Sequence, residues 1–146
     1  MPYPEYLVAP MRQELVAVGA RECRTVADVD DVVTSPGVVM MVVNSVCGCA
    51  AGKARPGIAM ALQHNNRPDT VATVFAGADV AATERARQYF AGFAPSSPSI
   101  ALMKDGKVVY MVERRDIESR SAESIADLLT LAFDKYCANE SAATTH

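Results

Sequence analysis

Residues 38–53 read VVMMVVNSVCGCAAGK, and this stretch carries the strongest structural signal in the chain. Val38 to Val43 is a continuous apolar run rich in β-branched residues, and Ser35-Pro36-Gly37 precedes it as a turn. Such a run, bounded by turn signals, predicts a central strand that is buried on both faces. Cys49 to Gln63 then consists mostly of helix formers, so we expect a helix there, with a kink or a restart at Pro56-Gly57.

The chain beyond this helix continues to alternate between strands and helices. The predicted elements are a strand over Val71–Ala76, a helix over Thr83–Phe93, strands over Ser99–Met103 and Lys107–Val112, and a helix over Ala122–Cys137 that Ser121 can cap. Asp105-Gly106 separates the last two strands, and an Asp-Gly pair between apolar runs is a strong signal for a two-residue hairpin. The first strand–helix–strand unit requires a right-handed crossover and a parallel strand pair.

The residues before the first strand predict a short helical extension. We expect the first ten residues to be irregular because they include three prolines: Pro2, Pro4 and Pro10. Met11 to Val18 has the composition of a short helix. Thr25, with Asp28 three residues further on, predicts a helix that is capped at its N-terminus and runs through Val33.

These elements predict one α/β domain over residues 1–137, followed by a polar tail over residues 138–146 that we expect to be frayed. Their order matches a thioredoxin-like arrangement, with a mixed four-stranded sheet, helices on both faces and an N-terminal helical extension. A chain of 146 residues has the usual size of a single domain and can bury a core without disulfide staples.

The composition excludes several classes of function. Half of the residues are hydrophobic and 21% are charged, as in an ordinary globular protein. The longest apolar run is far shorter than the roughly 20 residues that a membrane helix needs. The net charge is −3 and there is no basic arm, so we expect neither nucleic acid nor a membrane as a partner. The first residues lack a cationic start and an apolar signal stretch, so we expect a cytoplasmic protein.

Cys47 and Cys49 lie where the predicted central strand gives way to a helix, which is the place where open α/β sheets bind their ligands. The free N–H groups and partial positive charge of a helix N-terminus favour a thiolate. The window from residue 32 to residue 68 contains no Asp or Glu and carries a charge of +3, so the rest of the chain carries −6. We therefore expect Lys53 and Arg55 to give the thiolate electrostatic support and to attract anionic thiols.

The single residue between the two cysteines constrains their chemistry. Two such cysteines can form a disulfide only if the backbone turns tightly enough to bring their Cα atoms within about 7 Å. Gly48 permits that turn because it has no Cβ. The resulting small ring is easier to reduce than a structural disulfide, which favours transient mixed-disulfide chemistry.

Two other interpretations of the cysteine pair stay open. One is a metal- or cluster-handling module, and the other is a thioredoxin-like binding domain without redox activity. A tetrahedral zinc site normally needs four nitrogen or sulfur ligands. The remaining candidates have no paired ligand spacing: Cys23, His64, Cys137 and His146. Cys137, at the end of an amphipathic helix, favours a structural role, and Cys23 belongs to no motif.

Three further features outside the dithiol bear on the site. Pro98 immediately precedes a predicted strand, where thioredoxin-like folds hold a cis-proline that faces the dithiol; a proline that simply starts a strand is the alternative. We expect Ser97–Pro98 to be cis and beside the cysteines. His64 lies in a polar loop and is expected to be solvated. Arg114-Arg115 is typical of a solvated face, with docking of a partner as the alternative.

Several segments resemble the bacilliredoxin family of thioredoxin-like proteins. They are VNSVCGCAAG at residues 43–52, ARP at 54–56, VFAG at 74–77, APSSPS at 94–99, and AFD at 132–134 with Cys137. The resemblance implies a thiol–disulfide oxidoreductase that removes bacillithiol from S-bacillithiolated proteins, and some relatives are viewed as disulfide isomerases. Cys47 would attack the mixed disulfide and Cys49 would resolve it.

The same resemblance implies the partners and the substrate site. No bound cofactor is expected, because the dithiol itself is the redox group and bacillithiol is a co-substrate. The partners would be S-thiolated proteins, a low-molecular-weight thiol and a disulfide reductase for recycling. We expect Asn44, Ser97 and Pro98 to contact the substrate.

Overall fold

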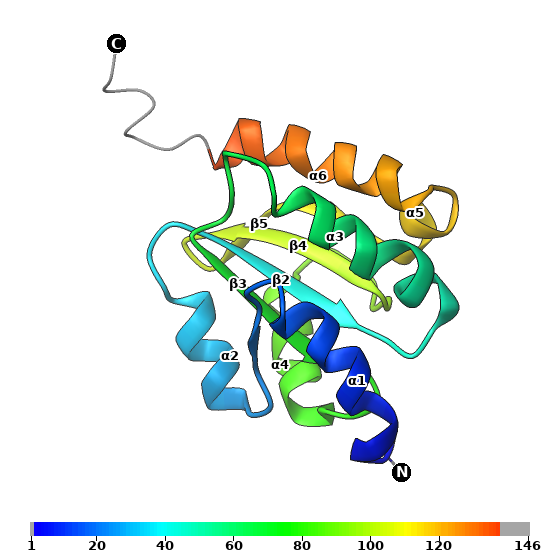
Figure 1. Ribbon diagram of the computed structural model, residues 1–146. Helices are drawn as coiled ribbons and strands as arrows, with labels where there is room; N and C mark the ends of the chain where they lie inside the picture. The colour runs from blue at the N-terminus through cyan, green and yellow to red at the C-terminus, as the bar shows by residue number, and fades with distance from the viewer. Residues whose placement is uncertain (1, 138–146) are drawn as a thin grey trace.

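The computed structural model describes residues 2–137 (Figure 1). Its strands are β1 (Arg21–Glu22), β2 (Val38–Asn44), β3 (Thr70–Phe75), β4 (Ser99–Lys104) and β5 (Lys107–Val112). Its helices are α1 (Glu5–Val16), α2 (Val26–Val33), α3 (Arg55–Ala61), α4 (Val80–Tyr89), α5 (Arg114–Glu118) and α6 (Ala122–Tyr136), with a π-helical segment η1 (Ala50–Ala54). The predicted tail, residues 138–146, lies outside the described residues. Within residues 2–137 no helix is long and apolar enough to cross a membrane.

The strands form one mixed sheet in the order β1-β3-β2-β4-β5. β3 runs parallel to β1 and β2, whereas β4 is antiparallel to β2 and β5 is antiparallel to β4. This is the predicted thioredoxin-like α/β fold, but the expected count of four strands is wrong. The fifth strand, β1, contains only two residues and therefore shows no alternation of polar and apolar residues from which to predict it.

The sheet separates two hydrophobic cores because the side chains of β2 alternate between its faces. Met40 and Val42 lie in the core that α3 and α6 cover, together with Ile58 and Phe133. Met41 and Val43 point to the opposite core, which α2 and α4 cover. Figure 1 shows these helix pairs on opposite sides of the sheet. All seven residues of β2 are buried, as the continuous apolar run predicts.

The prediction that the first ten residues are irregular is wrong, because α1 starts at Glu5 and contains Pro10. Pro10 lacks the N–H that would donate to the carbonyl of residue 6, which costs one internal hydrogen bond. Tertiary contacts offset that loss, since Val8, Arg12 and Leu15 recur at helical spacing and are buried. Because Arg12 is charged, the spacing of apolar residues alone does not predict this helix.

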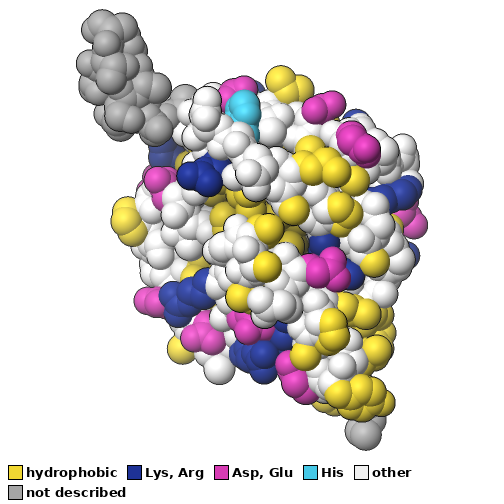
Figure 2. Space-filling model, viewed as in Figure 1, with side chains coloured by type: hydrophobic (Ala, Val, Ile, Leu, Met, Phe, Trp, Pro, Cys, Tyr) yellow, Lys and Arg dark blue, Asp and Glu magenta, His cyan; other side chains and the backbone are white. Residues whose placement is uncertain are grey.

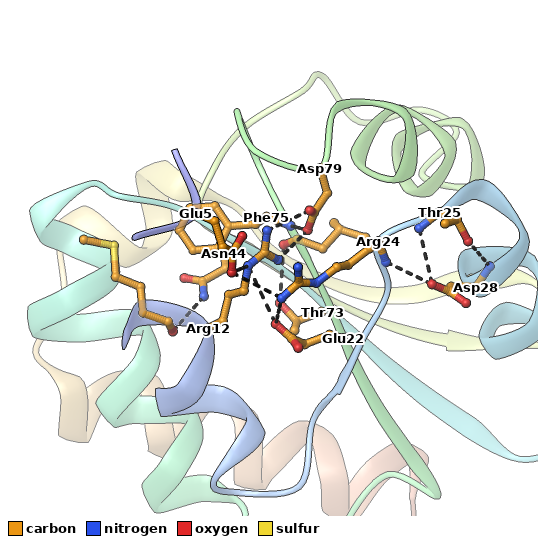
Figure 3. Close-up of polar contacts among 12 residues, drawn as sticks. Glu5, Arg12, Glu22, Arg24, Thr25, Asp28, Asn44, Thr73, Phe75 and Asp79 are labelled. Atoms are coloured by element: carbon orange, nitrogen blue, oxygen red, sulfur yellow. Dashed lines mark hydrogen bonds and ion pairs between the residues drawn. The ribbon is translucent and has the colours of Figure 1, made fainter. Parts of the chain in front are cut away.

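Arg12 fixes α1 to the end of β3 through a buried ion pair (Figure 3). Its two terminal nitrogens donate to the carboxylate of Asp79 at 2.7 and 2.8 Å. Asp79 also accepts a hydrogen bond from the backbone N–H of Phe75, and the guanidinium carbon lies 5.4 Å from the centre of the Phe75 ring. A buried charge needs a partner of this kind, and this partner is 67 residues away in sequence.

The remaining helices agree with the sequence in type and differ at their ends. Thr25 and Ser121 cap α2 and α6 as predicted, each accepting a hydrogen bond from the N–H three residues on. α4 starts at Val80 and ends at Tyr89, three to four residues earlier at both ends than expected. The helix α5 is not predicted from the sequence, because five residues are too few to show a helical repeat. The predicted irregularity near Pro56 is the π-helical segment η1, directly before α3.

Candidate active site

Cys47 occupies the N-cap position of the helix that follows β2. Its carbonyl oxygen accepts hydrogen bonds from the N–H groups of Ala50 and Ala51, at 2.9 and 3.2 Å, and helical backbone starts at Gly48. Cys49 therefore lies inside the first helical turn. An N-cap side chain can accept hydrogen bonds from the second and third helical N–H groups, which have no partner inside the helix. The sulfur of Cys47 thus lies at the N-cap, where a side-chain oxygen is usually found.

The two sulfur atoms lie 2.8 Å apart, and both thiols are free and partly exposed. A disulfide bond is about 2.05 Å long, so the bond can form with only a small movement of the side chains. Gly48 between them is exposed, and a Cβ at that position would meet nothing within 4 Å. The close approach of the two cysteines that the sequence predicts is therefore present, but the reason predicted for Gly48 is wrong, because this backbone has room for a Cβ.

The environment makes the two thiols unequal acids. A hydrogen bond from the Cys49 thiol lowers the pKa of Cys47, and the backbone N–H groups of Cys49 and Ala50 and the charge of Arg114 lower it further. Burial raises the pKa of Cys49, and the hydrogen bond and charge of Cys47 raise it as well. When the pair loses a proton, the negative charge therefore resides on Cys47, and the thiolate is the attacking form of a thiol.

Arg114, at the start of α5, belongs to the site, although the Arg114-Arg115 pair is typical of a solvated face, with docking of a partner as the alternative. Its Nη2 lies 3.4 Å from Sγ of Cys47, and its Nη1 donates to the carbonyl oxygen of Ser97 at 3.3 Å. One exposed guanidinium therefore joins the reactive sulfur to the loop before Pro98.

Strand registers explain how Arg114 reaches the dithiol, and they provide the signal that could have identified it. Val43 pairs with Ser99, so the end of β2 lies beside the start of β4. Ile100 pairs with Val112, so the end of β5 returns to the same edge. Counting from the Asp105-Gly106 hairpin, where Lys104 pairs with Lys107, places residue 114 opposite residue 97, and the bulge between Leu102 and Met103 shifts this register by one residue.

The Ser97–Pro98 peptide bond is cis, as predicted. Ser97 is partly exposed, whereas Pro98 is buried. The register of β2 with β4 and the contact of Arg114 with Ser97 bring this loop to the edge of the sheet that carries Cys47.

Asn44 and Arg55 hold the turn that carries the cysteines from behind. Nη1 of Arg55 donates to the side-chain oxygen of Asn44 and to the carbonyl of Ser45, both at 3.0 Å. Nε of Arg55 pairs with Glu14 at 3.0 Å, and the Asn44 amide donates to the carbonyl of Met11 at 3.2 Å. Asn44 is only 1% exposed, so its amide faces the protein interior and not the solvent from which a substrate would approach.

Lys53 and Arg55 do not reach the sulfur atoms, contrary to the support that the local charge predicts. Lys53 donates to the carbonyl of Glu118 at 2.6 Å, and the guanidinium of Arg55 is engaged in the buried network behind the turn. Charge counting along the sequence cannot show the direction in which a long side chain points. The cation that contacts Cys47 is Arg114, which lies 67 residues away.

The segment η1 widens the helix just after the dithiol. Pro56 has no N–H, and in a regular α-helix its ring would clash with the carbonyl of Gly52, four residues earlier. A π-helical turn over Ala50–Ala54 precedes it, and such turns occur frequently at functional sites. Gly57 then packs against α6, where an added Cβ would lie 2.8 Å from a methyl group of Ile125.

The other candidate metal ligands do not gather around the dithiol. Within residues 2–137 no group of three or more His, Cys, Asp or Glu side chains is placed to hold a metal ion. His64 pairs with Asp134 at 2.8 Å, on α6. Cys23 and Cys137 are buried, and burial raises the pKa of each thiol to about 11. His146 lies outside the described residues.

A thioredoxin-like sheet with a free dithiol at the N-terminus of its crossover helix defines a thiol–disulfide oxidoreductase. The chain matches a thioredoxin from Halobacterium salinarum with a TM-score of 0.56 at 18% identity, covering 82% of this chain and 92% of that one. That similarity supports the fold alone.

Sequence relatives identify the family. A family model described as disulphide isomerase matches residues 3–137. A bacilliredoxin from Koribacter versatilis is 55% identical over 136 residues, which covers 92% of this chain and 94% of that protein. A bacilliredoxin from Salinibacter ruber is 50% identical over 143 residues, covering 96% and 84%. The chain belongs to the bacilliredoxin family.

Proposed function

We propose that the protein removes a small thiol of the bacillithiol type from mixed disulfides on other proteins. The observation that carries this proposal is the position of Cys47, a partly exposed sulfur that caps a helix and lies 3.4 Å from a guanidinium nitrogen. A stabilised thiolate in contact with solvent is the group that attacks a disulfide. The relatives' printed name, bacilliredoxin, supports bacillithiol as the thiol removed.

In the first step the Cys47 thiolate attacks the bacillithiol sulfur of the mixed disulfide. A bond forms between that sulfur and Cys47, the original S–S bond breaks, and the electron pair leaves with the protein thiolate. Arg114 favours the thiolate before attack. The product is a mixed disulfide between Cys47 and the small thiol.

In the second step Cys49 attacks the sulfur of Cys47 and releases the small thiol. The negative charge of Cys47, which raises the pKa of Cys49, is gone once Cys47 is in the mixed disulfide. The pKa of Cys49 therefore falls at the moment when its thiolate is needed. The resulting Cys47–Cys49 disulfide is returned to the dithiol by a second small thiol or by a disulfide reductase.

The loop before Pro98 is the proposed contact for the substrate. Ser97 is partly exposed and is tied to the same arginine as Cys47, so a disulfide that reaches the sulfur lies beside it. Pro98 is buried at the end of this loop. For Asn44 we propose a positioning role in place of the expected substrate contact, because its amide makes three hydrogen bonds inside the protein.

We place this activity in the cytoplasm, where reduced small thiols and S-thiolated proteins meet, and we assign the protein no resident cofactor. On the face drawn in Figure 2, positive and negative side chains are interspersed and form no basic patch. That distribution fits protein substrates of varied charge and does not favour nucleic acid.

Disulfide isomerisation is a second candidate, which the description of the matching family model favours. It uses the same attack by Cys47, but the target is a non-native disulfide within a protein. Cys49 then allows escape when the substrate does not rearrange. Renaturation of a scrambled disulfide protein by the wild-type protein would measure this activity.

The deciding experiment measures release of bacillithiol from a purified S-bacillithiolated protein, with the same protein S-glutathionylated as the comparison. We expect catalysed release from the first substrate and slower release from the second. Equal rates would make the protein a general deglutathionylating and debacillithiolating enzyme. No release from either substrate, together with active renaturation of scrambled disulfides, would replace the proposal with isomerisation.

A further inference from the structure

A cavity of about 500 Å³ lies between α4 and the loop before Pro98, and no residue of the dithiol turn lines it. Successive turns of α4 supply one wall, with Val80, Thr83 and Arg87 on the same helical face. Pro95 supplies part of the opposite wall. The cavity is therefore a second concave site, distinct from the dithiol.

Arg87 brings a positive charge to this cavity and forms no ion pair with Glu84, which also lines it. Among the ion pairs within residues 2–137, none includes Arg87. Its Nε is buried without a hydrogen-bond partner, and its Nη2 makes one long contact, 3.4 Å to the carbonyl of Ser96. Burial lowers the pKa of Arg87, and no neighbouring charge acts in the opposite direction. A partly buried cation of this kind is incompletely solvated until an anion reaches it.

Thr83 supplies a second unsatisfied group one helical turn before Arg87. The residue is 3% exposed, and its hydroxyl oxygen has no hydrogen-bond partner. Buried polar groups in folded proteins are nearly always hydrogen-bonded, so an unpaired hydroxyl on a residue that lines a cavity indicates a missing partner. The oxygen is not accessible from the cavity in this structure, so it reaches a ligand only after a rotation about χ1. An oxyanion can accept from this hydroxyl and from the guanidinium together.

A neighbouring cavity, of about 590 Å³, provides an internal comparison because Arg114 and Arg115 line it. There the positive charges are already balanced, since Arg114 lies 3.6 Å from Glu118 and Arg115 lies 3.3 Å from Glu113. The two cavities thus differ in ion pairing, since among the described residues Arg114 and Arg115 each have a carboxylate partner and Arg87 has none.

We propose that the cavity between α4 and the Pro98 loop binds an anionic group, a phosphate or a carboxylate, on the guanidinium of Arg87 and the hydroxyl of Thr83. The apolar part of the same small molecule lies between Val80, which is 58% exposed, and Pro95. Glu84 also lines the cavity and repels such a group, so the cavity favours ligands whose charge is confined to one end.

The test is an NMR titration of the full-length reduced protein with inorganic phosphate and, separately, with acetate, at constant ionic strength. We expect saturable shifts of backbone amides in α4 and in residues 94 and 96, because Arg87 contacts the Ser96 carbonyl. Saturation by either oxyanion supports the proposal, and the anion that binds more tightly identifies the ligand class. Shifts that do not saturate, or that centre on α5, overturn it.

Three variants separate this site from general anion effects. Arg87→Gln should weaken phosphate binding by about tenfold or more, the usual effect of losing a charge-assisted hydrogen bond. Arg115→Gln should leave binding unchanged, because its charge belongs to the balanced cavity. Equal losses in both variants would overturn the proposal.

Thr83→Val is a second test of the site that does not depend on the folding of Arg87→Gln. The valine removes a hydroxyl that has no partner, so the variant should unfold at the same temperature as the wild type or a higher one. It should nevertheless bind phosphate more weakly. Wild-type phosphate affinity in Thr83→Val would remove the hydroxyl from the site, and with it the proposal.

Discussion

Two pairs of cysteines in this chain have opposite chemical character. Cys47 and Cys49 lie at the edge of the sheet and are partly exposed, whereas Cys23 and Cys137 lie in the two cores on either side of it. The surroundings lower the pKa of Cys47, while burial raises the pKa of each core thiol to about 11. The same residue type is thus a nucleophile in one place and a small apolar side chain in the other.

Cys47 lies at the N-terminus of one helix and Cys137 at the C-terminus of another, and this adds to the difference in acidity between the two thiols. Cys47 caps the N-terminus of the crossover helix, where free N–H groups favour a negative charge. Cys137 follows the C-terminus of α6 and donates its own N–H to the carbonyl of Phe133 at 2.7 Å. The partial negative charge at that end disfavours a thiolate. Its position at a helix C-terminus and its burial therefore both disfavour the thiolate of Cys137.

Replacing Cys47 gives the largest expected effect. Cys47→Ser should reduce the release of the small thiol to the uncatalysed rate, because a serine hydroxyl does not ionise near neutral pH and cannot form the mixed disulfide. The measurement is release of the thiol by chromatography, with Cys23→Ala as the control. Wild-type turnover in Cys47→Ser would assign the attack to another thiol and end the distinction between the two pairs.

Replacing Cys49 should stop the cycle one step later. Cys49→Ser keeps the attack by Cys47 but removes the internal thiol that resolves the intermediate. The protein should then gain the mass of one small thiol, and a strong reductant should remove it. If the Cys49→Ser protein never carries this adduct, the proposed order of attack and resolution is wrong.

Replacing Arg114 should have an intermediate effect. Arg114→Gln removes a cation that lowers the pKa of Cys47, so the pKa rises and a smaller fraction is thiolate at neutral pH. The alkylation rate measured against pH should shift its midpoint upward, and turnover near neutrality should fall by less than about tenfold because the arginine is exposed and screened.

The matched control for Arg114→Gln is Lys53→Gln. Lys53 donates to the carbonyl of Glu118 and contacts neither sulfur atom, so the midpoint should not move. A shift of similar size in both variants would mean that the general positive charge of the region sets the pKa of Cys47, as charge counting along the sequence suggests.

Replacing a core cysteine should change stability and leave activity intact. Cys23→Ala removes a fully buried sulfur and should lower the free energy of unfolding by roughly 1–2 kcal/mol, the cost of a small cavity. Denaturant unfolding measures this loss, and the thiol-release assay should give the wild-type rate. A drop in turnover without a drop in stability would give Cys23 a role in the chemistry.

The sequence predicted the elements whose physics is local. The apolar run over Val38–Val43, the Asp-Gly hairpin and the caps at Thr25 and Ser121 each depend on residues a few positions apart, and each is present. The cysteine pair is likewise at the predicted junction, because a strand end and the following helix are adjacent in the chain.

Long-range partners account for what the sequence could not supply. Arg12 is buried because carboxylates, chiefly that of Asp79, pair with it. Arg114 reaches Cys47 through the registers of two strand pairs. For Asn44 the family resemblance predicts contact with the substrate, whereas its side chain is buried and is hydrogen-bonded inside the protein. Side-chain direction, which decides each of these roles, is not encoded in spacing along the chain.

The helix cap at Cys47 also affects which oxidation state the protein prefers. The N–H groups of Cys49 and Ala50 and the charge of Arg114 stabilise a negative sulfur, which exists only in the reduced protein. A disulfide sulfur carries no charge and gains nothing from them, so thermodynamic linkage shifts the exchange equilibrium with surrounding thiols toward the dithiol. In a reducing compartment the protein therefore rests in the form that is ready to attack, and the helix terminus that activates the nucleophile also helps to set its reduction potential.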